Sequence, residues 1–111
     1  MSAREILERT IKSAAASAEV MKEIKGMEKT FQFKTNEGEN FYVRISGGTA
    51  EVLGGMAEKA STTIAGSDQT LSDLLSGKLD PVKAFMSGQI KVSGDVFAAQ
   101  KITSLMKKAG A

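Results

Sequence analysis

Residues 74–95 read LLSGKLDPVKAFMSGQIKVSGD, and the order of signals in this stretch decides the fold class. Gly77 and Gly88 stand where helices commonly end, because glycine adopts the left-handed backbone at low cost. Asp80-Pro81 predicts a helix start: the Asp side chain can accept from free N–H groups, and Pro at the first helical position loses no needed hydrogen bond. Residues 89–93 alternate polar and apolar side chains, which predicts a strand. The stretch therefore predicts helix, helix and strand in close succession.

The N-terminal residues have a helical period. Apolar side chains recur there at spacings of four and three: Leu7, Ile11, Ala14, Ala18 and Met21. This spacing puts them on one face, so we predict a single helix over residues 3–25 that ends near Gly26. The stripe is interpreted as core packing, with an interaction seam in an oligomer as the alternative.

Residues 31–65 have the period of strands. Phe31 and Phe33 alternate with polar residues, and so do Phe41, Val43 and Ile45. Weaker strands are predicted over 49–53 and 61–65, separated by glycine-rich turns. From residue 68 the period becomes helical again. The predicted fold is α+β: a five-stranded mixed, largely antiparallel sheet with helices covering one face, in one domain over residues 1–111.

The last helix is expected to begin after Asp95 and to run to about residue 108. Apolar residues are dense in the C-terminal half, where core packing explains most of them and a lipid pocket is the sharper hypothesis. The candidate lipid-binding residues are Leu71, Leu74, Leu75, Phe85, Met86, Phe97, Ile102, Leu105 and Met106. Lys107 and Lys108 are expected either at the mouth of such a cavity or simply in solvent.

Composition argues against several function classes. The chain has neither His nor Cys, the commonest ligands and bases of metal and nucleophilic sites, so no metal site and no cofactor are predicted. The 15 basic residues nearly balance 13 acidic ones and are scattered, so no nucleic-acid partner is expected. Paired glycines at 47–48 and 54–55 lack phosphate-loop spacing and are interpreted as turns. The N-terminus lacks a signal-peptide pattern, and a cytoplasmic location is the expectation.

No catalytic residue is predicted. Of Asp68, Asp73, Asp80 and Asp95, three stand at predicted helix starts, where capping already explains an acid. The candidate nucleophiles, Ser61, Ser67 and Thr70, have no neighbouring base in the pattern.

Residues 74–81 and 84–95 resemble the signature of the sterol carrier protein-2 domain. That family typically shows a Leu-x-Gly-Lys-Leu-Asn/Asp-Pro turn, then Ala-Phe, a Gly-Lys-Leu-Lys-Ile strand and Gly-Asn/Asp. The strands at 31–33 and 41–45 and the Gly38-Glu39 hairpin also fall where the family has them. The resemblance covers about residues 24–106, with a sterol-carrier-like core over 26–109.

The resemblance implies an apolar tunnel between the sheet and the helices, and ligands such as fatty acids, acyl-CoA, sterols or phospholipids. This chain departs from the pattern at Ser61, where the family often has Asp, and in its Ala-rich first helix. It also lacks the peroxisomal tail of animal members. A fatty acid or acyl-CoA is therefore expected rather than a sterol.

Two functions remain open at this point. The first is a non-catalytic carrier that holds one acyl-type lipid in an internal cavity, with at most transient membrane-surface contact. The second is an accessory or oligomerisation module with a vestigial cavity, which would form a homodimer or bind a partner enzyme. A small hydrolase or transferase is disfavoured because His and Cys are absent.

Overall fold

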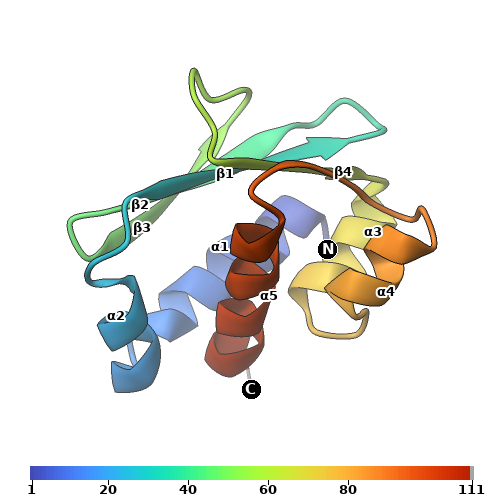
Figure 1. Cartoon of the computed structure of the whole chain (residues 1–111). Coiled ribbons are helices and arrows are strands. Elements are labelled where there is room, and N and C mark those ends of the chain that lie inside the picture. The colour runs from blue at the N-terminus through green and yellow to red at the C-terminus, as the bar shows by residue number, and fades with distance from the viewer. Residues whose placement is uncertain (111) are drawn as a thin grey trace.

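In the computed structural model, which describes residues 1–110, helices cover one face of a single sheet (Figure 1). The helices are α1 (Ala3–Ala14), α2 (Ala18–Ile24), α3 (Asp68–Leu75), α4 (Pro81–Met86) and α5 (Val96–Gly110). The strands are β1 (Lys29–Thr35), β2 (Phe41–Ser46), β3 (Thr49–Gly54), β4 (Thr62–Gly66) and β5 (Lys91–Gly94). The predicted α+β class is confirmed.

The sheet has five strands in the order β3-β2-β1-β4-β5. Tight turns join β1 to β2 and β2 to β3, so these neighbours pair antiparallel. The chain then crosses to the other side of β1, where β4 pairs with it in parallel, and β5 closes the edge antiparallel to β4. The sheet is therefore mixed and largely antiparallel, as predicted.

The core lies between the sheet and the helices. Phe33 and Phe41 stack there with ring centroids 5.0 Å apart, and Ile64 of β4 is fully buried beside them. Gln32 points to the opposite face, yet it is buried too. Its amide donates to the carbonyls of Phe41 and Gly55 and its oxygen accepts from the Ala57 N–H. These bonds hold the loop over residues 55–61, which rises above the sheet in Figure 1.

The predicted single helix over 3–25 is wrong: two helices replace it, with a break at residues 15–17. Ser17 starts the second helix, because its hydroxyl accepts from the Val20 N–H at 3.3 Å. The break turns the buried face, so that Val20 and Ile24 enter the core while Ala18 is exposed. Of the predicted apolar stripe, Leu7 is buried as expected, whereas Ala18 is exposed.

The helix starts predicted at Asp80 and Asp95 are confirmed. Asp80 accepts from the Val82 N–H at 2.8 Å, and Asp95 accepts from the Ala98 N–H at 3.1 Å. Ser67 caps α3, which leaves the Asp68 carboxylate to accept from the Ala3 N–H at 3.0 Å. The hydrogen bond from Ala3 to Asp68 thus joins the start of α1 to the start of α3, although the two helices are far apart in the sequence.

Candidate lipid-binding pocket

An apolar pocket of about 80 Å³ lies between the sheet and helices α3, α4 and α5. Its walls come from Ile64 and Val92 of the sheet, Ile90, Leu74 of α3, Pro81, Val82 and Phe85 of α4, and Val96, Ala99, Gln100 and Thr103 of α5. Only Gln100 and Thr103 carry polar groups. The Thr103 hydroxyl donates to the Gln100 carbonyl at 2.8 Å, so α5 itself satisfies it. The interior can therefore take only an apolar group.

A second, polar cleft of about 400 Å³ adjoins the apolar pocket. The two share Leu74, Pro81, Gln100 and Thr103 in their walls. The cleft adds three charged residues: Lys78 from the α3–α4 turn and Lys107 from α5 are cationic, and Asp80, whose carboxylate caps α4, is anionic. The pocket could therefore hold the apolar tail of a ligand while the adjoining cleft holds its polar head.

A third space, an apolar void of about 30 Å³, lies on the other side of α5. Ile102, Leu105 and Met106 line it from α5, opposite side chains of α1, α2 and β2. Figure 1 shows α5 in front of α1, with α2 on one side of α5 and α3 and α4 on the other. The helix therefore separates two apolar spaces under one sheet.

The structure distributes the nine candidate residues over four settings. Leu74 and Phe85 line the apolar pocket, and Ile102, Leu105 and Met106 line the void beyond α5. Leu71 and Leu75 are buried in the core and line neither space. Met86 and Phe97 do not line them either: they are 80% and 82% exposed. Phe97, a candidate lipid-binding residue of the last helix, thus faces solvent and not a cavity.

Sequence reasoning missed Val82 and Val96 as pocket residues. Each occupies the first turn of its helix: Val82 is two residues after the capping Asp80, and Val96 directly follows the capping Asp95. Val82 stands three residues before Phe85, a spacing that puts both side chains on one helix face and could have identified them together. Ala99 was missed because a small side chain carries no strong apolar signal, although its size is what leaves room for the pocket.

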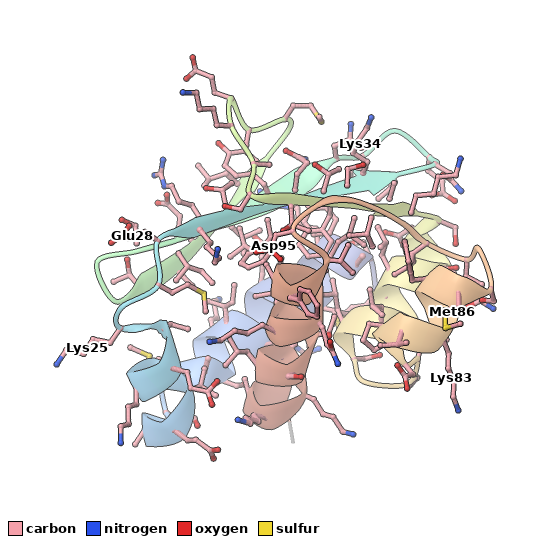
Figure 2. The ribbon with its side chains drawn as sticks, in the orientation of Figure 1. Lys25, Glu28, Lys34, Lys83, Met86 and Asp95 are labelled. Atoms are coloured by element: carbon pink, nitrogen blue, oxygen red, sulfur yellow. The ribbon has the colours of Figure 1, made fainter. Side chains whose placement is uncertain are left out.

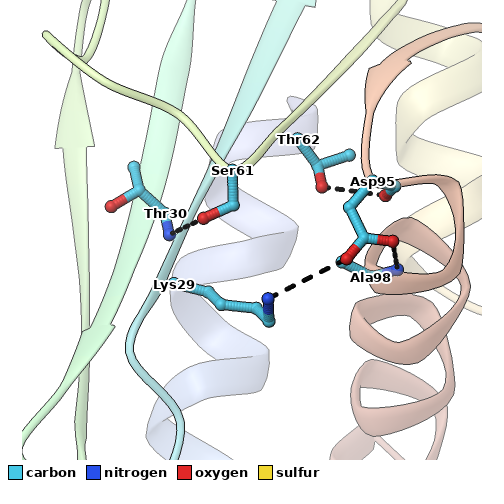
Figure 3. Close-up of polar contacts among 6 residues, drawn as sticks. All are labelled: Lys29, Thr30, Ser61, Thr62, Asp95 and Ala98. Carbon is cyan, nitrogen blue, oxygen red and sulfur yellow. Dashed lines mark hydrogen bonds and ion pairs between the residues drawn. The ribbon is translucent and has the colours of Figure 1, made fainter.

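The first turn of α5 is fixed to the sheet (Figure 3). Asp95 caps the helix, and its second carboxylate oxygen lies 3.9 Å from the Lys29 ammonium. The Thr62 hydroxyl donates to the Asp95 carbonyl at 2.9 Å. Ser61, the departure from the family pattern, accepts from the Thr30 N–H at 3.2 Å through its hydroxyl and so joins β4 to β1. These bonds hold the N-terminal end of α5 against β1 and β4.

The C-terminal end of α5 is fixed differently. The Lys108 ammonium lies 2.7 Å from the Glu23 carboxylate and 3.4 Å from that of Glu19, both on α2. Lys108 therefore faces away from the polar cleft, and only Lys107 of the two predicted lysines lies at its wall. The hydrogen bond from Lys108 lowers the pKa of Glu23 and raises that of Lys108. The ion pairs of Lys108 with Glu19 and Glu23 thus connect α5 to α2.

Among the described residues, no three acidic side chains gather as a metal site would require. No helix in residues 1–110 has the length and apolar character needed to cross a bilayer.

The SCP-2 sterol transfer family model matches residues 4–107. This chain belongs to that family. Sterol carrier protein 2 of Rattus norvegicus is 34% identical over 92 residues, which are 78% of this chain and 16% of that protein. The chain spans less than a fifth of the length of the first curated relatives that it matches.

Two solved structures share the fold. The sterol carrier protein domain 2 of Helicoverpa armigera has a TM-score of 0.74 at 27% identity, over 96% of this chain and 86% of that one. The palmitated SCP2L2 of Aedes aegypti has a TM-score of 0.66 at 22% identity, over 96% of this chain and 95% of that one. The resemblance stated from residues 74–95 is confirmed.

Proposed function

We propose that this SCP-2 domain is a non-catalytic carrier for one acyl-type lipid, with the tail in the apolar pocket and the anionic head in the polar cleft. The observation that carries the proposal is the junction of the two spaces. The apolar pocket adjoins the cleft at Gln100 and Thr103, and the cleft presents two lysines, Lys78 and Lys107, against one carboxylate, Asp80, which is engaged as the cap of α4. Membership of a lipid-transfer family supports the same function.

The volume of the pocket sets a condition on this proposal. A void of about 150 Å³ holds benzene, and sites for drug-sized ligands measure roughly 300–1,000 Å³. A pocket of about 80 Å³ holds only the first methylenes of a long chain. An outward shift of α5 would join the pocket to the 30 Å³ void beneath Leu105 and Met106. We therefore propose that α5 moves when a full acyl chain enters.

A straight acyl chain fits this arrangement better than a sterol does. A flexible chain can thread from one small space to the next, whereas a rigid ring system needs one wide cavity. The palmitated state of the Aedes aegypti neighbour supports an acyl ligand for the fold, and we extend it to this chain as part of the proposal.

The energetics allow this function. Burial of about ten methylenes contributes on the order of 8 kcal/mol at ~0.8 each. Lost freedom on association and the displacement of α5 offset part of that gain. Micromolar affinity, about 8 kcal/mol, then requires a contribution from the head, for which Lys78 and Lys107 are placed.

Native mass spectrometry of the purified protein and displacement of a fluorescent fatty acid test the proposal together. We expect a retained lipid, or saturation at micromolar ligand. A protein that is empty and does not saturate by about a millimolar, where the free energy is only ~4 kcal/mol, would contradict the carrier function.

The second candidate is an accessory module of a longer enzyme system. The observation in its favour is that curated relatives are several times longer than this chain. An empty homodimer in the same mass spectra would favour it. In either function the domain itself is proposed to be inert: incubation with acyl-CoA and generic esters should give no turnover above buffer. A rate that one Ser or Asp substitution abolishes would contradict this.

A further inference from the structure

The mouth of the apolar pocket carries most of the exposed apolar side chains. Seven large apolar side chains are exposed in the described chain, and five of them belong to α4 and the first turn of α5. We call these five the mouth patch: Val82, Phe85, Met86, Val96 and Phe97. Val82, Phe85 and Val96 also line the pocket, so its opening lies within the patch.

Helical spacing places the two most exposed members at this opening. Met86 is 80% exposed and follows Val82 by four residues on α4, and Figure 2 shows it on the outer side of that helix. Phe97 is 82% exposed and precedes Gln100, another pocket residue, by three on α5. Residues three and four apart share a helix face, so Met86 and Phe97 flank the opening from its two helices.

The area of the mouth patch matches one side of a homodimer interface. A large apolar side chain has roughly 150–250 Å² of surface, so the exposed fractions of the five members leave on the order of 500 Å² in water. A standard interface buries about 800 Å² on each partner, and roughly 65% of that area is apolar in homodimers. The patch therefore supplies the apolar part of such an interface without any exposure of the core.

The charges beside the mouth patch are balanced. Two acids and two bases lie next to it: Asp80 and Lys83 of α4, and Lys29 and Asp95 at the start of α5. The hydrogen bond from Lys108 and then the charge of Lys101 lower the pKa of Glu23, so Lys101 lies toward α2. A balanced rim gives no net attraction to an anionic surface, but it can meet a surface of its own composition with unlike charges opposed.

We propose that two copies of the chain pair through the mouth patch, about a two-fold axis that runs between α4 and α5. In such a pair α4 of each copy packs on the first turn of α5 in the other. Lys83 of one copy then lies opposite Asp95 of the second copy, and the same contact recurs at the other end of the interface. The inference goes beyond the carrier function, because pairing requires the patch and does not require a lipid.

Pairing also extends the apolar space open to a ligand, a consequence that rests on the proposed carrier function. A pocket of about 80 Å³ opens within the patch of each copy. In the pair both openings face one apolar interface. Methylenes that a single pocket cannot hold then lie between the two patches and out of water.

Sedimentation velocity between about 1 and 100 µM tests the pairing, and we expect a dimer in this range. Phe97→Ser should weaken the dimer roughly 100-fold, about tenfold for each of two symmetric anchors. Met56→Ser is the matched control: Met56 is 56% exposed, but it lies in the loop above the sheet, and its loss should change the dimer affinity by less than about twofold. A monomer throughout this range, or equal effects of the two variants, would overturn the proposal.

Charge reversal tests the axis. Lys83→Glu sets like charges against Asp95 of the second copy and should weaken the dimer by about fivefold or more. Lys25→Glu changes the net charge equally and lies by α2, on the opposite side of the view in Figure 2, so it should have little effect. Equal weakening by both variants would reflect net charge alone and would overturn the proposed axis.

Two further assays separate this pairing from another occupant and from the carrier function. A monomer that co-sediments with phosphatidylcholine vesicles, and fails to do so after Phe97→Ser, would assign the patch to a lipid surface and overturn the pairing. Fatty-acid displacement reports on the pocket, which Phe97 does not line. A dimer that binds no fatty acid would support the pairing and contradict the carrier function, and a monomer that saturates with fatty acid would do the reverse.

Discussion

Among the glycines, Gly94 has the least room for a side chain. Its φ is +86°, and a Cβ at this position would lie 2.5 Å from the Ser61 carbonyl oxygen. Two backbones meet there, so neither can retreat by changing a rotamer. The glycine that the sequence placed before the last helix thus allows β5 to turn into α5 while α5 stays close to β4.

Gly94→Ala is therefore expected to destabilise the domain by about 3 kcal/mol, from the strained φ and the clash together. Urea unfolding followed by circular dichroism measures this. Gly26→Ala, where nothing lies within 4 Å and φ is not positive, should change the unfolding free energy by less than about 1 kcal/mol. Gly38→Ala, with φ of +89° in open space, isolates the backbone strain. If Gly94→Ala and Gly38→Ala lower the free energy of unfolding equally, the contact with the Ser61 carbonyl contributes nothing beyond the backbone strain.

Helix α5 is the element on which the proposed carrier depends. Its first turn is held to β4 and β1, while its last turns are held to α2 by the Lys108 ion pairs. Exposed pairs contribute little because water screens them. The ion pairs therefore add little to the stability of the last turns, and the burial of Ile102, Leu105 and Met106 is what holds this half of α5 in place.

Acid should weaken the contact between that end of α5 and α2. The pKa of Glu23 is lowered from its usual 4.5 by the hydrogen bond from Lys108. A depressed carboxyl pKa stabilises the folded contact above the unfolded value, and this contribution is lost as pH falls through the folded pKa. Corrected for intrinsic exchange rates, amide exchange in residues 104–108 should accelerate below about pH 4.5 relative to residues 97–100. Glu23→Gln should reduce this acid dependence and leave Glu19 as the second partner of Lys108. An unchanged dependence would exclude the Glu23 contact as its main cause.

Filling either apolar space tests whether one ligand uses both. Ala99→Leu puts a larger side chain into the 80 Å³ pocket, and Ala14→Leu puts one into the void beyond α5. If a bound chain passes under α5, both should weaken fatty-acid binding by roughly tenfold, since each removes space for one or two methylenes. Ala16→Leu, at an exposed position, is the control. Weakening by Ala99→Leu alone would confine the ligand to the first pocket.

At the scale of the whole molecule, ligand binding should appear as added stability. A lipid that binds only the folded domain adds about 2.7 kcal/mol at 100 times its Kd. For a domain of this length that raises Tm by roughly 10 °C or more. Differential scanning fluorimetry with palmitate below its critical micelle concentration measures the shift, and acetate at equal concentration is the control. The same shift with acetate would indicate a salt effect.

Local signals in the sequence located the helices and strands from β1 onward, although β5 spans Lys91–Gly94 and so begins two residues after its predicted start. Asp80-Pro81 starts α4 and Gly88 ends it, because capping and left-handed backbone depend only on neighbouring residues. The alternation of Phe31, Phe33 and Ile64 with polar neighbours determined which face of each strand is buried. Together with the motif at residues 74–95, these signals determined the α+β class and the family.

Tertiary structure decided the rest, because the deciding partners are distant in sequence. The break after α1 follows from the Ser17 cap and the burial of Val20, which no unbroken helical stripe indicates. Lys108 turns from the proposed mouth to α2 because Glu23, 85 residues away, lies beside it only in the fold. Met86 and Phe97 resemble core residues in sequence, and only the packing of α4 and α5 leaves them in solvent. Apolar periodicity indicates that a side chain prefers burial, but the neighbouring elements decide whether there is room for it.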